Sequence, residues 1–221
     1  MNFRKVIIPL TVVTLSCFLV ILFLLLCVCT DESAWLGNAF GRKLYMLGLV
    51  PLYVFGTVYI DRQMTVPAMI RIGQRTKVTT TLLSRRCKFA FAYLCTWFML
   101  VNLFTIIKYN HFHEMTALDI IHKFFRYLLG FILVSIIAEI FSRSGNKYLS
   151  GNSYLGADLI PALEMMVIVP EIRKYARNDF NIVFSWIFWD IDIFFAYVVL
   201  ITMITVLLFY LYKVSVRKDI L

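Results

Sequence analysis

The chain has 221 residues, of which 61% are hydrophobic and only 16% are charged, and its mean hydropathy is +0.81. A soluble domain is usually nearer half apolar and a quarter charged, so the composition excludes an ordinary soluble protein and predicts an all-α integral membrane protein. The net charge of +9 would suggest nucleic-acid binding in a soluble chain. In a membrane protein it is better explained by chain orientation and by anionic lipid headgroups, so we expect lipids and no nucleic acid as partners.

Apolar runs mark the expected membrane spans, each of which needs roughly 20 residues to cross the hydrocarbon core. Five segments meet this requirement or come close to it, at 6–30, 44–60, 89–107, 124–141 and 193–212. A sixth segment, 154–170, is weaker because it contains Asp158, Pro161 and Glu164. Together the six predict a single transmembrane domain over residues 1–221.

Lysine and arginine indicate which side of the membrane each connection occupies, since they accumulate in the cytoplasm. They precede the first span and follow the last, so both termini are expected inside, which requires an even number of crossings. With six spans, the inner segments hold fourteen of the 22 basic residues and the outer segments hold eight. We expect the first span to be retained rather than cleaved as a signal peptide, because its apolar run continues well past Cys17.

The connection 61–88, between the second and third expected spans, concentrates positive charge. It holds one acid, Asp61, and seven basic residues, which are Arg62, Arg71, Arg75, Lys77, Arg85, Arg86 and Lys88. One interpretation is topological, since such charges keep a connection in the cytoplasm and contact lipid phosphates. We adopt it for the last three, and expect Arg85, Arg86 and Lys88 to hold the inner end of the third span at the headgroups.

The first part of this connection favours a second interpretation, a surface for a partner. Pro67 suits the first turn of a helix, and the pattern predicts a short interfacial helix over 66–77. On that helix Arg71 and Arg75 share a face at spacing i, i+4, and Gly73 lets another backbone approach closely. The charges are thus organised rather than scattered, as a docking surface requires.

Residues 70–77, Ile-Arg-Ile-Gly-Gln-Arg-Thr-Lys, resemble the Arg-x-Gly-x-Arg-x-Lys stretch between the second and third spans of short bacterial type 2 ABC exporter permeases. Six spans within 221 residues, and the tail 218–221 after a tyrosine-rich last span, are similar to that family over the whole chain. The chain looks most like permeases that export peptides, including bacteriocin-like and phenol-soluble-modulin-like toxins. The resemblance implies the type 2 ABC exporter permease fold in a bacterial plasma membrane.

The resemblance also implies a coupling helix between the second and third spans, which docks on a separate ABC ATPase subunit. Its residues are Ile70, Arg71, Ile72, Gly73, Arg75 and Lys77, with the two isoleucines as apolar contacts. An external re-entrant hairpin before the sixth span is implied as well, and is expected at 171–190. A second permease subunit, either a copy of this chain or a related one, is implied to complete the export path.

Energy for transport has to come from a partner, because the chain lacks the Gly-x-x-x-x-Gly-Lys-Ser/Thr phosphate loop. We expect no cofactor on this chain, ATP and Mg²⁺ on the partner subunit, and no catalytic residues here. The resemblance thus implies the permease subunit of an ATP-driven exporter of amphipathic peptides or toxins, and not an enzyme. The alternative is an immunity or sensor protein that binds an antimicrobial peptide in the membrane without transporting it.

Three acidic residues fall inside the expected spans, where charge is costly and usually faces a cavity or a partner. Glu139 lies four residues before Arg143, which favours a local ion pair. Asp158 and Glu164 are the candidates for the export conduit. There Glu164 would line the path or contact a cationic peptide, provided that 154–170 crosses the membrane.

An outer loop contains His111, His113 and Glu114, a set of residue types that can bind a metal ion. The zinc-protease signature would need histidine three residues after Glu114, but Ala117 occupies that position. An ordinary solvated loop is therefore favoured, and we expect no metal site.

Overall fold

A computed structural model of the chain describes residues 4–29, 31–61, 75–109, 117–143, 153–164, 184–188 and 193–219. Within these ranges every element is a helix and no strand occurs. Four described segments are long and apolar enough to cross a membrane: Glu32–Asp61, Thr76–Tyr109, Leu118–Ser142 and Ile193–Val216. Helix α1 (Arg4–Val28) matches the first expected span, and its part Val12–Val28 is apolar as well. The chain is therefore an all-α membrane protein.

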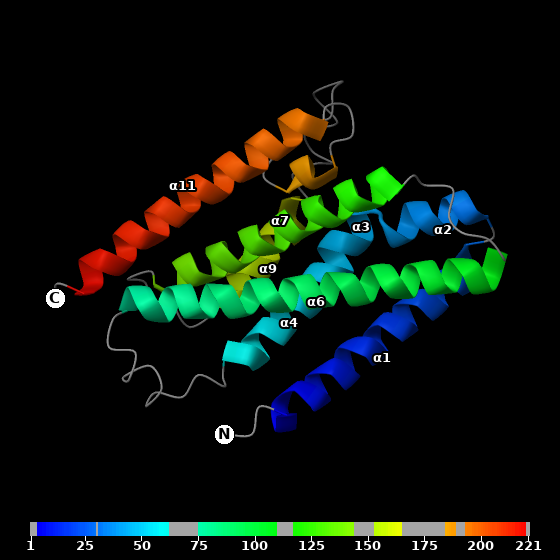
Figure 1. Cartoon of the computed structure of the whole chain (residues 1–221), viewed down its shortest axis with the longest axis horizontal. Helices are drawn as coiled ribbons and strands as arrows, with labels where there is room; N and C mark the ends of the chain where they lie inside the picture. The colour runs from blue at the N-terminus through cyan, green and yellow to red at the C-terminus, as the bar shows by residue number, and fades with distance from the viewer. Residues whose placement is uncertain are drawn as a thin grey trace.

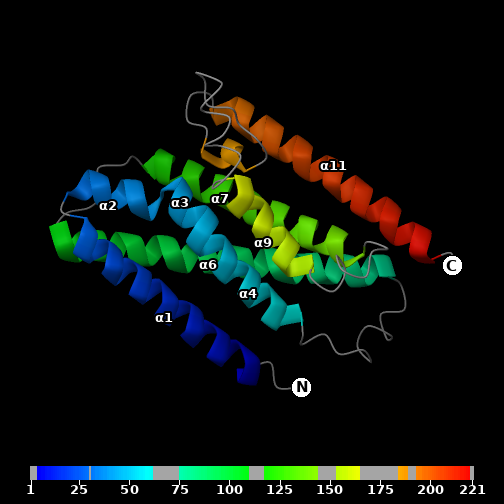
Figure 2. The same ribbon diagram turned by 180° about the vertical axis from the view of Figure 1, so that it is seen from behind.

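The long helices pack as a bundle whose members alternate in direction (Figures 1 and 2). Helices α1 and α6 (Arg75–Tyr109) run one way, and α4 (Val50–Asp61), α7 (Ala117–Ser142) and α11 (Ile193–Asp219) run the other. As a result the start of α1 and the end of α11 lie toward the same end of the bundle. We call this the basic end, because α4, α7 and α11 finish there and α6 begins there with its cluster of lysines and arginines.

The second expected span is longer and less regular than the run 44–60. It begins with α2 (Glu32–Ala39), turns at Gly41, and continues through α3 (Arg42–Leu44), the π-helix η1 (Tyr45–Leu49) and α4. A Cβ on Gly41 would come within 2.6 Å of the Gly37 carbonyl oxygen, so only glycine fits this turn. The wide π turn comes just before Pro51, which has no N–H to donate to the preceding turn.

The third expected span, 89–107, is the apolar part of a longer helix. Helix α6 has 35 residues, which corresponds to about 52 Å of helix, well beyond the roughly 30 Å of a hydrocarbon core. Its first turn holds Arg75 and Lys77, which we expected at the end of a separate helix over 66–77. For 75–77 that expectation is wrong, since these residues continue into the span; residues 62–74 lie outside the described part of the chain.

The fifth expected span, 154–170, is described only over its first part. There the chain forms α9 (Ser153–Leu163), whose 11 residues rise about 16 Å, close to half of a hydrocarbon core. Helix α9 packs beside α7 and α4 and contains Pro161 near its end. Within the expected hairpin 171–190, residues 184–188 are described, and Ser185–Phe188 of them form the short 3₁₀ helix η3.

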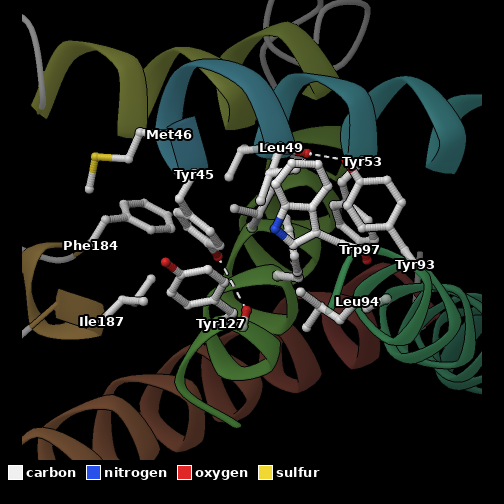
Figure 3. Packing of buried hydrophobic residues seen from close by; sticks show 14 of the residues in the cluster. Tyr45, Met46, Leu49, Tyr53, Tyr93, Leu94, Trp97, Tyr127, Phe184 and Ile187 are labelled. Atoms are coloured by element: carbon white, nitrogen blue, oxygen red, sulfur yellow. Dashed lines mark hydrogen bonds between the residues drawn. The ribbon is translucent and has the colours of Figure 1, made fainter. Parts of the chain in front are cut away.

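Aromatic side chains fill the centre of the bundle, where α4, α6, α7 and η3 meet (Figure 3). Their hydroxyl groups bond to backbone carbonyls of neighbouring helices, as buried tyrosines require. Tyr45 donates to the Tyr127 carbonyl at 3.2 Å, and Tyr93 donates to the Leu49 carbonyl at 2.9 Å. Tyr127 in turn donates to the Phe40 carbonyl at 2.6 Å. These bonds fix the rotation of each helix against the next.

Candidate functional site: a buried ionic joint at the basic end

Three helices meet at a group of charged side chains near the basic end. Arg86 of α6 holds Asp61, the last residue of α4, through Nε and Nη2, both to Oδ2, at 2.9 and 2.6 Å. The same Nη2 lies 2.9 Å from Oε2 of Glu139 on α7. Oε1 of Glu139 accepts a bond of 2.8 Å from Nε of Arg143, one turn further along α7. We call these four residues the ionic joint.

Uncharged groups complete the surroundings of the Arg86 guanidinium. Its Nη1 donates to the Ser135 carbonyl oxygen at 3.0 Å. The hydroxyl oxygens of Tyr53 and Ser135 are 2.7 Å apart, and the Tyr53 hydroxyl also lies 3.2 Å from the Arg86 carbonyl oxygen. Tyr53 on α4 and Ser135 on α7 therefore connect the same three helices deeper in the bundle. The site is a network and not an isolated pair.

The effect of this network on stability depends on its burial. The side chains of Arg86 and Glu139 are each only 3% exposed, and those of Asp61 and Arg143 are 12% and 13% exposed. Charges withdrawn from water are tolerated when they are paired and hydrogen-bonded, as they are here. Removing one partner leaves a buried charge uncompensated, which typically destabilises a protein by about 3–5 kcal/mol.

Two predictions from the sequence concern residues of this site, and one of them is confirmed while the other is wrong. The local pair of Glu139 with Arg143 is confirmed at 2.8 Å. The expectation that Arg86 lies at the lipid headgroups is wrong, because that residue is buried and faces Asp61 and Glu139. The physical reason is the continuity of α6: positions 86 and 88 point in nearly opposite directions on a helix. Lys88 is accordingly exposed while Arg86 is buried.

The sequence did contain a signal for the inward direction of Arg86. The buried residues of α6 follow a helical spacing of three to four, and continuing that stripe backward from the apolar run passes through position 86. Its members are Thr79, Leu82, Arg86, Ala90, Tyr93, Trp97 and Val101. Asp61, the single acid among seven basic residues in 61–88, was the second signal.

A second feature of the basic end is the first part of α6, residues 75–88, which we call the α6 extension. It lies before the apolar run that begins at Phe89, and exposes Lys77, Thr80, Ser84 and Lys88. The Thr80 and Thr81 hydroxyls donate to the Lys77 carbonyl at 3.0 and 2.7 Å, which keeps their polar groups within the first turns of the helix. The extension is therefore a polar, cationic helix.

The predicted coupling residues divide between this extension and the part of the chain that is not described. Ile70, Arg71, Ile72 and Gly73 lie outside the described residues. Arg75 is the first residue of α6, and Lys77 is exposed in its first turn. The structure thus brings Lys77 onto the extension and leaves the relation of Arg71 to Arg75 a prediction.

The two predicted conduit residues have different surroundings. Glu164, at the end of α9, is only 1% exposed, and both its carboxylate oxygens accept the Phe184 N–H, at 3.1 and 2.9 Å. This contact joins α9 to the start of η3. Asp158 is half-buried between one and two turns earlier on α9, so the two carboxylates do not share a helix face. The structure does not bring them together.

Of the three histidines, only His122 lies within the described residues, and it precedes Glu139 by seventeen residues on α7. His111, His113 and Glu114 lie outside the described residues, and within the described ranges no group of three His, Cys, Asp or Glu residues is arranged to hold a metal ion. His122 on α7 pairs with Tyr197 on α11: the Tyr197 hydroxyl is 3.3 Å from Nδ1 and 3.1 Å from the His122 carbonyl oxygen. This contact fastens α11 to α7 far from the basic end.

Comparison with known protein families, with curated proteins and with solved structures found no match to this chain.

Proposed function

We propose that this chain is the permease subunit of an ATP-driven exporter in a bacterial plasma membrane, coupled to a separate ATPase subunit. The observation that supports this best is the α6 extension. Lys77 precedes Phe89 by twelve residues, which is about 18 Å of helix, whereas the headgroup region adds only about 5–8 Å to each side of the hydrocarbon core. A lysine at that distance supports a partner in water over a lipid phosphate.

The rest of the proposal follows the family that residues 70–77 resemble. The coupling segment comprises residues 70–77, and its last three residues, 75–77, form the start of α6. Both termini are cytoplasmic, and α9 with the chain after it supplies the fifth of six membrane passages before an external hairpin. A second permease subunit completes a path for amphipathic peptides, and the partner ATPase binds ATP and Mg²⁺.

Within this proposal Asp158 and Glu164 belong to the fifth passage, next to the path. Glu164 holds the turn toward η3 through the Phe184 N–H. The half-buried Asp158 is the better candidate for contact with a cationic cargo, since Glu164 is almost completely buried.

The double charge reversal Arg71→Glu/Arg75→Glu tests the proposal. The tagged chain is purified from its native membrane, and retained subunits are identified by mass spectrometry. Uptake of a dye-labelled cationic amphipathic peptide is then followed in inside-out vesicles supplied with ATP. We expect the wild-type chain to retain an ATPase subunit and to take up peptide, and the variant to lose both while its membrane insertion persists.

Lys213→Glu is the matched control, because Lys213 is an exposed basic residue at the same end of the bundle. It is expected to retain both the partner and peptide uptake. Unchanged uptake in the double variant would contradict the coupling role of 70–77. Peptide binding by a wild-type chain that retains no ATPase subunit would replace the exporter with the immunity or sensor protein.

A further inference from the structure

We propose that the ionic joint is the fulcrum of a lever, and that Arg86 is the positioning residue that passes a displacement of the α6 extension to α7. The inference rests on the proposed function, because the displacement is supplied by a partner acting on residues 62–77. It assigns a mechanical role to four charges that the resemblance to permeases leaves without one.

The first requirement of a lever is stiffness, and α6 meets it. All 35 residues from Arg75 to Tyr109 form one helix, and none of them is glycine or proline. Sharp bends in helices occur mostly at such residues, so α6 has no hinge in its sequence. Arg86 lies eleven residues from the start, about 16 Å along the helix axis. A displacement of the start of α6 at Arg75 is therefore transmitted to Arg86 without bending of the helix.

The second requirement is a pivot that the chain shares on either side of residues 62–74. Asp61 is the last residue of α4 and directly precedes 62–74, while α6 begins directly after it. Arg86 bonds to Asp61, so one guanidinium anchors the chain on both sides of this segment. A force applied to 62–74 therefore reaches the Arg86 side chain both through Asp61 and through the start of α6.

The third requirement is a contact that transmits the displacement to another helix, and Glu139 on α7 provides it. The Nη2 atom of Arg86 lies between Asp61 Oδ2 and Glu139 Oε2, at 2.6 and 2.9 Å. Displacement of Arg86 thus pulls directly on α7. Helix α7 packs against α9 and α11, and its other end is fastened to α11 through His122 and Tyr197. A shift at the joint therefore reaches the part of the bundle expected to line the path.

Stability alone is a poor explanation for these charges. Buried ion pairs can often be replaced by apolar side chains of similar volume with no loss of stability. Four charged groups in a mostly dry site do offer a specific arrangement of helices, because a guanidinium between two carboxylates tolerates few geometries. The joint is therefore suited to keeping α4, α6 and α7 in register while they move.

The test needs a variant that removes the charges of Asp61, Arg86 and Glu139 together, so that none of these three is left as a lone buried charge. Asp61→Asn/Arg86→Met/Glu139→Gln does this. Arg143, whose side chain is 13% exposed, keeps its charge, and the amide in place of the Glu139 carboxylate still offers it an oxygen acceptor. We call this triple variant the neutral joint. Lys88→Met is its matched control, because it removes a cation two residues away on the exposed side of α6.

The first measurement does not depend on a partner. Spin labels are attached at Lys77→Cys and Ile121→Cys, two exposed positions on the extension and on the far end of α7, after the five native cysteines are replaced. The width of the distance distribution is measured by pulsed electron resonance. We expect the distribution to become about twofold wider in the neutral joint and to stay unchanged in Lys88→Met. Equal widths in the wild-type protein and the neutral joint would overturn the fulcrum.

The second measurement is the amount of labelled peptide transported per ATP hydrolysed in vesicles. The neutral joint should retain the ATPase subunit and hydrolyse ATP, but transport about tenfold less peptide per ATP, which is a typical size for a lost coupling. A role in folding alone would lower the amount of complex and leave this ratio unchanged, and that result would overturn the inference. If the wild-type chain retains no ATPase subunit, the proposed function fails. The widths of the spin-label distance distributions then still test whether the ionic joint couples α6 to α7.

Discussion

Helices α7 and α11 have similar lengths, 26 and 27 residues, but opposite environments. In an apolar 18-residue stretch of α7, 56% of the residues are buried. In the corresponding stretch of α11 only 11% are buried, although α11 is the more apolar of the two helices. Helix α7 differs in carrying Arg126, Gly130, Ser135 and Glu139, all of them buried or closely packed. Between these two helices, the one that is more buried carries the polar and small residues and is the less apolar, as expected where lipid is as apolar as leucine.

This comparison predicts that α7 is sensitive to substitution and that α11 is tolerant. The largest effect should come from Glu139→Ala, which leaves Arg86 and Arg143 without the carboxylate they share. We expect a loss of about 3–5 kcal/mol in unfolding free energy, or failure to accumulate in the membrane. Thr205→Ala on α11 is the control, because its hydroxyl bonds only to the Ile201 carbonyl of its own helix among the described contacts. Thermal unfolding in detergent measures both; similar shifts for the two variants would contradict the comparison.

A smaller effect is expected from Gly130→Ala in α7. The new Cβ would overlap the Tyr45 hydroxyl oxygen and Ile187 Cδ1, so these two buried side chains would have to move. Overpacking of this kind costs about 1–3 kcal/mol. Gly37→Ala in α2 provides the matched control, since a Cβ there meets no atom within 4 Å. That control should be neutral or stabilising by up to about 1 kcal/mol, and an equally large loss in both would show that packing at Gly130 is not the cause.

Tyr127→Phe removes one hydroxyl from the aromatic centre. The Phe40 carbonyl then loses the bond of 2.6 Å that it accepts from Tyr127. We expect a loss of about 1 kcal/mol, a normal value for one buried hydrogen bond. On α11, Tyr210→Phe removes the same group from a side chain that is 51% exposed, and should change stability by less than about 0.5 kcal/mol. The difference between the two melting temperatures is the measurement, and its reversal would be evidence against the account.

The smallest effect should come from Phe209→Ala, although it deletes the largest number of atoms from α11. The Phe209 side chain is 70% exposed in the described chain, and lipid can fill the space that it leaves. The expected change is within about 0.5 kcal/mol by thermal unfolding in lipid nanodiscs. A large loss would mean that this face of α11 packs on protein and is not lipid-facing.

Hydropathy predicted the membrane class and the approximate positions of α1, α4, α6, α7 and α11, because long apolar runs have few alternatives to a membrane helix. Local spacing also predicted the Glu139–Arg143 pair, since i, i+4 contacts depend on one helix alone. The limits of α6 were missed, because a polar sequence such as 75–88 gives no hydropathy signal when it continues a span. The contacts of Arg86 depend on three helices 25 to 53 residues apart, so local reasoning on residue type placed it wrongly at the surface.

The fifth passage shows a different limit. Asp158, Pro161 and Glu164 weakened the hydropathy of 154–170, and the described part of it is indeed a short helix. The sequence contained no signal for the contact of Glu164 with the Phe184 N–H, because carboxylate-to-backbone contacts across 20 residues follow no periodic pattern.

Site-specific photocrosslinking from Lys77 is the most direct test of the claim that the α6 extension faces a partner in water. A benzophenone amino acid is placed at Lys77 and, as a control, at Thr202 on the exposed side of α11, and both are irradiated in native membranes. We expect position 77 to form an adduct with a soluble polypeptide that carries a Gly-x-x-x-x-Gly-Lys-Ser/Thr loop, and position 202 to form none. Adducts with lipid alone at position 77 would contradict a partner in water and would make the extension a membrane anchor.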